Sequence, residues 1–208
     1  MRKELCINED WQFQYHDNTI LPVNLPHTWN NLDGQDGGND YWRGTCIYRK
    51  NFPLPAFGAE DCVYLDFAGV NASATVTLNG TQVCTHDGGY STFRCEITQL
   101  LKEINQLEVA VDNSKNDRVY PQKADFTFYG GIYRDVKLII VPKAHFDLDY
   151  LGSCGIRVTA TPDGDKATVR VESRTTGGQK QEFFISRIAI CRSSQARPLP
   201  PARAPMPP

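Results

Sequence analysis

The sequence lacks a marked excess of charge of either sign. Its 22 basic and 24 acidic side chains leave a formal net charge of −2, whereas proteins that bind nucleic acid usually carry a basic patch. It also has no apolar run long enough to span a bilayer, and residues 1–9 lack the apolar segment of a secretory signal. We therefore expect no nucleic acid and no membrane among the partners, and a location in the cytoplasm rather than the periplasm.

Cysteine pairs at metal-binding spacing are missing as well. None of the seven cysteines forms a Cys-x-x-Cys pair, and several alternate with apolar residues, as Cys95 does between Phe93 and Ile97. This pattern favours buried free thiols in a reducing compartment over a disulfide framework or a zinc site. His27 and His86 have no companions at metal-ligand spacing, and no glycine-rich loop opens an expected helix. The sequence therefore predicts neither a metal nor a cofactor.

Alternation of apolar and polar residues is what the sequence has in abundance. Residues 63–67 and 74–78 both alternate with a period of two, which is typical of strands. Asn79-Gly80 follows the second run and is the strongest short signal for a two-residue hairpin turn. Helical periodicity is scarce, and only residues 98–105 have room for one helical turn. Many short strands without intervening helices predict an all-β fold, a sandwich or jelly roll.

An apolar run that ends at Pro142 marks an expected domain boundary. Residues 1–142 suffice for one β-sandwich, whereas residues 143–178 hold only two or three strands. A sandwich takes about seven strands, so the second domain is expected to be partial. From residue 179 the alternation is lost, and the proline-rich stretch to residue 208 predicts an irregular, disordered tail. We hypothesise that the reading frame shifts near residue 178, which resequencing of the locus tests.

Six short motifs make the chain more than a generic β protein. In order, they are residues 25–30 (LPHTWN), 40–44 (DYWRG), 48–52 (YRKNF), 67–74 (FAGVNASA) with 78–80 (LNG), 86–90 (HDGGY) and 129–136 (YGGIYRDV). Each motif is weak alone. Six in this order, at spacings that fit one domain, resemble the opening of glycoside hydrolase family 2 enzymes of the β-galactosidase type. The resemblance covers about residues 7–175.

The resemblance implies a galactose-binding-domain-like jelly roll, followed by an immunoglobulin-like β-sandwich that this chain only begins. Enzymes of this family retain anomeric configuration by means of two carboxyl groups about 5–5.5 Å apart. The resemblance places those groups in a later TIM barrel, which needs roughly 250 further residues. It therefore implies no catalytic residue in this chain, which we expect to be inactive alone.

The same resemblance suggests residues that touch sugar. Asp125 lies nine residues before the arginine of the last motif, where the family has an aspartate that contacts the galactosyl unit. Asn39 and Asp40 lie where the family places an amide that bonds a sugar hydroxyl. Phe128 and Tyr129 stand close to Asp125 and offer ring faces to a pyranose. The ordinary alternatives are a solvated loop aspartate, a turn rich in Gly, Asn and Asp, and core aromatics.

These observations leave an enzyme fragment and a binding module open. In the first interpretation, the parent hydrolyses β-galactosides or related β-glycosides, and this piece gives structural support and part of the rim of the sugar pocket. In the alternative, the chain is a stand-alone, non-catalytic carbohydrate-binding module. The expected partner is a β-galactoside or related sugar, bound weakly or not at all without the barrel. The family also implies homo-oligomeric assembly of the parent enzyme.

Overall fold

The computed structural model describes residues 2–31, 41–120, 127–164 and 166–177. The described residues form strands and two short 3-10 turns. The strands are β1 (Lys3–Cys6), β2 (Trp11–Gln14), β3 (Ile20–Val23), β4 (Thr45–Pro53), β5 (Asp61–Phe67), β6 (Ser73–Leu78), β7 (Thr81–Asp87), β8 (Phe93–Glu96), β9 (Ile104–Asp112), β10 (Val136–Pro142), β11 (His145–Phe146), β12 (Ile156–Asp163), β13 (Lys166–Ser173) and β14 (Thr175–Thr176). The turns are η1 (Thr98–Leu100) and η2 (Tyr150–Gly152). The predicted irregular tail and the hypothesised frame shift lie outside the described residues.

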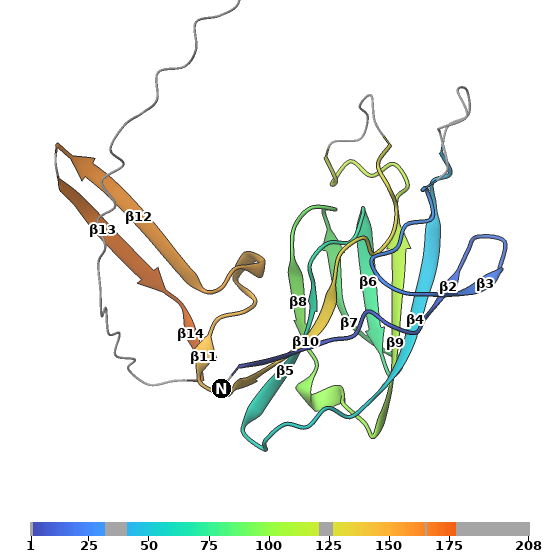
Figure 1. The fold of residues 1–208 in the computed structure, drawn as a ribbon, viewed down its shortest axis with the longest axis horizontal. Helices are drawn as coiled ribbons and strands as arrows, with labels where there is room; N and C mark the ends of the chain where they lie inside the picture. The colour runs from blue at the N-terminus through green and yellow to red at the C-terminus, as the bar shows by residue number, and fades with distance from the viewer. Residues whose placement is uncertain (1, 32–40, 121–126, 165, 178–208) are drawn as a thin grey trace, which may run out of the picture. The chain divides into compact units, whose positions relative to one another are not determined.

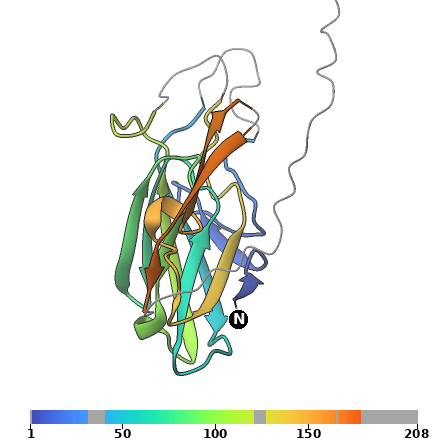
Figure 2. The same ribbon diagram turned by 90° about the vertical axis from the view of Figure 1, so that its left-hand side faces the viewer.

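Two antiparallel sheets form a β-sandwich. One sheet has six strands in the order β3-β2-β4-β9-β6-β7, and the other has four in the order β1-β10-β5-β8. Figures 1 and 2 show their strands in two layers. Neighbours such as β4 and β9, or β5 and β10, are far apart in sequence, so the chain crosses repeatedly between the layers. The predicted all-β sandwich is confirmed. No helix in the described part of the chain has the length and apolar character to cross a membrane.

Period-two alternation explains how the strands build the core. In β9, Leu107, Val109 and Val111 are at most 1% exposed and face the other sheet, while Glu108 is only partly buried on the outer side. The predicted hairpin is also confirmed. Asn79 and Gly80 have φ angles of 53° and 85° and join β6 to β7, as a two-residue turn of type I′ requires.

A second, smaller core lies on the outer face of the four-stranded sheet. Tyr64 of β5 packs there with Ile139, Val141 and Leu148, so β5 is buried on both faces. Leu148 belongs to the segment that follows β11. The alternation in β5 predicts only one buried face, because the residues that cover the other lie about 80 positions later in the sequence.

One arginine fastens this covering segment to the sheet. Arg94 of β8 pairs with Asp66 of β5 through Nε–Oδ1 at 2.5 Å, and each side chain is 11% exposed. The Arg94 Nη1 group also donates to the carbonyl oxygens of Leu148, Gly152 and Ser153, at 3.1, 2.9 and 2.7 Å. A single guanidinium therefore holds four acceptors in fixed positions, which its planar fork of donors allows.

The ribbon of β12 and β13 is amphipathic. Val158 pairs with Val171 on one face, while Arg157 pairs with Glu172 on the other. Val158 and Val171 are 62% and 51% exposed. The sequence predicted two or three strands in residues 143–178, and β12 and β13 lie there. The domain boundaries stay predictions.

Candidate functional site

Loops from both sheets meet at one end of the sandwich. Strands β4 and β6 begin at this end, and strands β7 and β9 end there. Residues 127–133 lie at the same end. Hydrogen bonds tie these loops together: Asn71 Nδ2 donates to the carbonyl oxygen of Tyr129 (2.8 Å), and the Gly88 amide donates to that of Ala72 (2.9 Å). Loops positioned by a rigid sheet are the usual place for binding residues.

Two buried amides fix the base of this loop cluster. Asn113 Nδ2 donates to Asn30 Oδ1 (3.1 Å), which also accepts the Gly130 amide (2.8 Å). Asn30 Nδ2 donates to the Trp42 carbonyl (2.9 Å), and Asn113 Oδ1 accepts the Gly44 amide (2.9 Å). Asn30 and Asn113 are 0% and 4% exposed. The bonds join residues on both sides of segment 32–40 and connect them to Gly130, four residues after segment 121–126.

A pocket lined by three tyrosines opens in the loop cluster. We call it the tyrosine pocket. It has a volume of about 320 Å³ and is lined by Thr28, Asn71, Tyr90, Thr127, Tyr129 and Tyr133. A second, smaller hollow shares Asn71 and Tyr90 with it and adds Phe128 and Tyr120, among other residues. Tyr90 and Tyr129 are 57% and 39% exposed, so their rings are open to a ligand.

Tyr133 forms the rigid wall of the tyrosine pocket. Its hydroxyl donates to the carbonyl oxygen of Gly89, and burial raises the pKa of the phenol. Gly89 is required beside it, because a Cβ at this position would lie 2.2 Å from Asn71 Oδ1. Backbone bonds between Asn71 and Gly131, at 3.0 and 3.1 Å, fix the other side.

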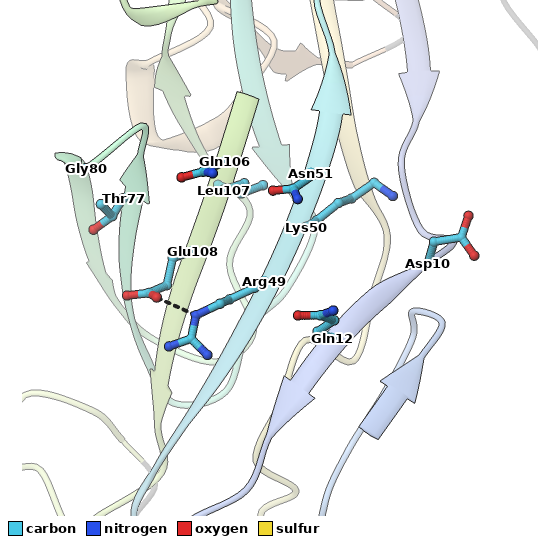
Figure 3. Close-up of a pocket in the computed structure, with 10 residues that line it drawn as sticks. All are labelled: Asp10, Gln12, Arg49, Lys50, Asn51, Thr77, Gly80, Gln106, Leu107 and Glu108. Carbon is cyan, nitrogen blue, oxygen red and sulfur yellow. Dashed lines mark hydrogen bonds and ion pairs between the residues drawn. The ribbon is translucent and has the colours of Figure 1, made fainter. Parts of the chain in front are cut away.

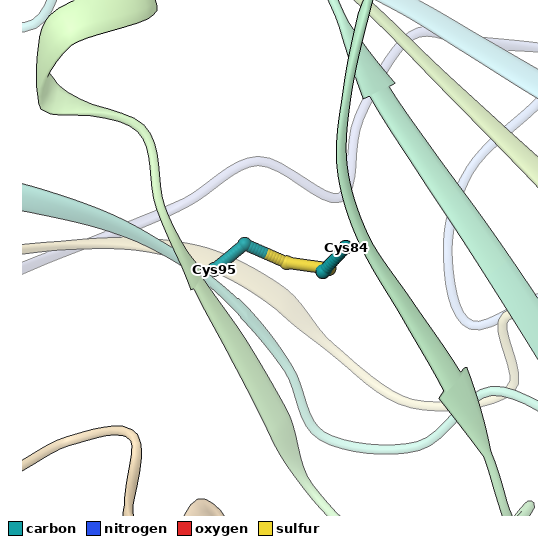
Figure 4. Close-up of a disulfide and its surroundings, with 2 residues drawn as sticks. All are labelled: Cys84 and Cys95. Carbon is teal, nitrogen blue, oxygen red and sulfur yellow. A yellow bond between two sulfur atoms is a disulfide. The ribbon is translucent and has the colours of Figure 1, made fainter.

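The loop that carries Tyr90 is closed at its base by a disulfide. Cys84 of β7 and Cys95 of β8 are bonded, with their Cα atoms 6.1 Å apart (Figure 4). His86 also contacts the Ser91 hydroxyl through Nε2 at 2.9 Å, and burial lowers the pKa of this imidazole. The prediction of free thiols is therefore wrong for this pair. The two residues lie on opposite sheets, and strand alternation cannot indicate which residues meet across a sandwich.

Reduction of the disulfide is expected to lower the free energy of unfolding by about 2–3 kcal/mol, because the cross-link restricts a short loop in the unfolded chain. Urea unfolding of the oxidised chain, with and without a thiol reductant, measures the difference. Cys84→Ser is the control, since its unfolding midpoint should not respond to the reductant. A wild-type midpoint that does not move would contradict the role of the bond. The free cysteines of the described chain, Cys6, Cys46, Cys62 and Cys154, are present in both proteins.

The sequence-predicted sugar contacts divide into two groups. Asp125, Asn39 and Asp40 lie outside the described residues, although the buried amides hold the flanks of both their segments. Tyr129 lines the tyrosine pocket, whereas Phe128 is only 9% exposed and borders the smaller hollow. All five assignments as sugar contacts stay predictions.

Sequence reasoning missed Tyr90, Asn71 and Tyr133. Only two aromatics, Phe128 and Tyr129, were predicted as sugar contacts, because they stand close to Asp125. Tyr90 ends the motif HDGGY and Asn71 lies within FAGVNASA, so membership of two motifs was the available signal. The alternation of the neighbouring residues does not indicate that Asn71, Tyr90 and Tyr133, which are 19 to 62 positions apart in the sequence, line the same pocket.

A different hollow lies on the outer face of the six-stranded sheet. Arg49 pairs there with Glu108 through Nε–Oε2 at 2.7 Å and also donates to Gln14 Oε1 (2.5 Å). Figure 3 shows Arg49 and Glu108 beside Gln12, Asn51 and Gln106 on neighbouring strands. Its lining includes no aromatic ring. Among the described residues, no three His, Cys, Asp or Glu side chains gather closely enough to hold a metal ion.

A family model decides the identity of the fold. The model described as "Glycosyl hydrolase 2 galactose-binding domain-like" matches residues 28–149. The chain belongs to glycoside hydrolase family 2. The match includes strands β4 to β11 and all six residues that line the tyrosine pocket, while β1, β2 and β3 precede it.

Named relatives are glucuronidases and galactosidases. The β-glucuronidase of Bacteroides fragilis is 35% identical over 207 residues, which cover 93% of this chain and 30% of that protein. The β-galactosidase of Thermoanaerobacterium thermosulfurigenes is 32% identical, over 66% of this chain and 21% of that protein. The crystal structure of an FMN-binding β-glucuronidase from Facaelibacterium prausnitzii L2-6 has a TM-score of 0.80 and 43% identity, over 86% of this chain and 29% of that chain. This family 2 chain therefore spans about 30% of the length of such relatives.

Proposed function

We propose that this chain is the leading, non-catalytic part of a retaining glycoside hydrolase that cleaves β-glucuronides or β-galactosides. The observation that carries the proposal is the family match over residues 28–149, together with relatives that this chain matches only in their N-terminal region. Its role is to support the fold and to supply one wall of a sugar pocket. We also propose that the whole enzyme assembles into a homo-oligomer, as the family implies.

The chemistry of such an enzyme needs two carboxyl groups about 5–5.5 Å apart, one as nucleophile and one as acid and base. In our proposal, both belong to the barrel and not to this chain. The loop cluster contributes binding energy instead. Hydroxyl groups of the sugar would meet the segments around residues 39–40 and 125, whose flanks the buried amides Asn30 and Asn113 hold.

The purified chain is expected to release no nitrophenol from 4-nitrophenyl β-D-glucuronide or β-D-galactoside, because the catalytic carboxyl pair lies elsewhere. A spectrophotometric assay at saturating substrate measures this, with a full-length glycosidase of the family as the positive control. Hydrolysis that persists after further purification of the chain would contradict the proposal that the chain is non-catalytic. Activity of a longer protein from the same locus, containing a barrel with two glutamates, would support the assignment of the parent.

A stand-alone carbohydrate-binding module is the second candidate. The exposed rings of Tyr90 and Tyr129 favour it, since such a module needs its own aromatic platform. The two candidates differ in strength of binding: a module should hold sugar tightly without any other domain, whereas one wall of a shared pocket should bind weakly.

A further inference from the structure

The tyrosine pocket offers two unoccupied ring faces and one unoccupied acceptor. Neither Tyr90 nor Tyr129 packs against another aromatic ring within the described chain, and both are more than a third exposed. Asn71 is 8% exposed, and its Nδ2 group already donates to the Tyr129 carbonyl at 2.8 Å. Its Oδ1 atom accepts no bond from the residues that the structure describes, yet it is not a fully enclosed atom. Asn71 is one of the residues that line the pocket.

The residues that line the pocket also indicate which kind of ligand group it does not recognise. None of its six lining side chains is charged. The Thr28 hydroxyl is already engaged, because it donates to the Gly130 carbonyl at 2.8 Å. The remaining groups are the exposed rings of Tyr90 and Tyr129 with their hydroxyls, the Thr127 hydroxyl and the Asn71 amide oxygen, all of them neutral. A carboxylate would find no cation among these side chains, and a flat ring that bears hydroxyl groups matches both kinds of surface.

We propose that the tyrosine pocket binds an uncharged face of a pyranose ring. The C–H face of the sugar packs on Tyr129 or Tyr90, and one ring hydroxyl donates to Asn71 Oδ1. This inference rests on the proposed function, and it names a subsite separate from the contacts expected of Asp125, Asn39 and Asp40. Because the lining is uncharged, the subsite does not distinguish a galactoside from a glucuronide.

The pocket is held in shape before any ligand arrives. Tyr133 is bonded to Gly89, the Asn71 backbone is bonded to Gly131, and the disulfide closes the loop that carries Tyr90. Binding therefore orders few groups, which reduces the entropic loss on association. A pocket of this size with one hydrogen bond and one or two stacked rings should bind with a dissociation constant in the millimolar range.

Titration of the chain with methyl β-D-galactoside and methyl β-D-glucuronide, followed by the NMR signals of the tyrosine rings, tests the inference. We expect saturable shifts of Tyr90 and Tyr129 with similar millimolar constants for both sugars. Tyr129→Ala and Tyr90→Ala should each weaken binding about fivefold, the loss expected for one stacked ring. Tyr120→Ala is the matched control, because Tyr120 is 89% exposed and does not line the tyrosine pocket. Thermal unfolding checks that all three variants fold.

Three outcomes would overturn the inference. They are shifts that do not saturate, equal weakening by Tyr120→Ala, and binding of 4-nitrophenol as tight as that of the sugars, which would make the pocket a site for aromatic rings. A strong preference for the glucuronide would overturn the uncharged subsite. None of these results touches the proposed parent activity, which is tested by hydrolysis in the longer protein.

Discussion

Replacing Arg94 with alanine is expected to lower the free energy of unfolding by about 3–5 kcal/mol, because it leaves a buried carboxylate without its partner. Asp66 would lose its salt bridge to Arg94, and the carbonyls of Leu148, Gly152 and Ser153 would lose a shared donor. Urea unfolding followed by tryptophan fluorescence measures the change. The covering segment should also become sensitive to proteolysis, since Leu148 and Arg94 are its main attachments to the sheet.

Arg49→Ala is the matched control for Arg94→Ala. Arg49 also pairs with a carboxylate on a neighbouring strand, at 2.7 Å, but the two side chains are 38% and 42% exposed. Solvent screens such a pair, so its loss should cost less than about 1 kcal/mol. Equal losses in the two variants would show that burial does not set the value of these ion pairs. The double variant Arg94→Met with Asp66→Leu should recover part of the loss, because it leaves no buried unpaired charge.

Local sequence signals predicted the layers of the fold. The strands β5 and β6 and the turn at Asn79-Gly80 were predicted from neighbours within a few residues, and all three are confirmed as elements. The family motifs extended this to the order of the elements. Local signals cannot predict the second buried face of β5, because Leu148, which covers it, belongs to a segment that is distant in sequence.

The candidate site was less predictable than the fold. A disulfide between Cys84 and Cys95 depends on two strands that lie in different sheets, although only 11 residues separate the cysteines. Phe128 was predicted as a sugar contact and Tyr90 was not, yet Phe128 is 9% exposed and Tyr90 57%. Exposure of a loop aromatic follows from how several loops pack on each other, which no periodicity reports. The compartment inferred from the cysteines stays a prediction.

Shared dependence on buried amides connects the fold to the proposed site. The tyrosine pocket and the flanks of segments 32–40 and 121–126 are tied to the same two side chains, Asn30 and Asn113. Buried polar groups that are fully bonded specify one arrangement, because every alternative leaves some of them unpaired. The buried amides at the base of the loops therefore set the loop geometry, and contacts among the loop tips do not.

Asn30→Ala is expected to lower the free energy of unfolding by about 3–5 kcal/mol, since each buried donor or acceptor left unpaired costs about 1–3 kcal/mol. The groups affected are the Gly130 amide, the Trp42 carbonyl and Asn113 Nδ2. The NMR signals of Tyr129 should broaden at the same time, while those of β12 and β13 should not change. Asn51→Ala is the control, because Asn51 is exposed on the outer sheet face and should change stability by less than about 0.5 kcal/mol. A stable Asn30→Ala protein with unchanged Tyr129 signals would mean that the loops hold their geometry without the amide network.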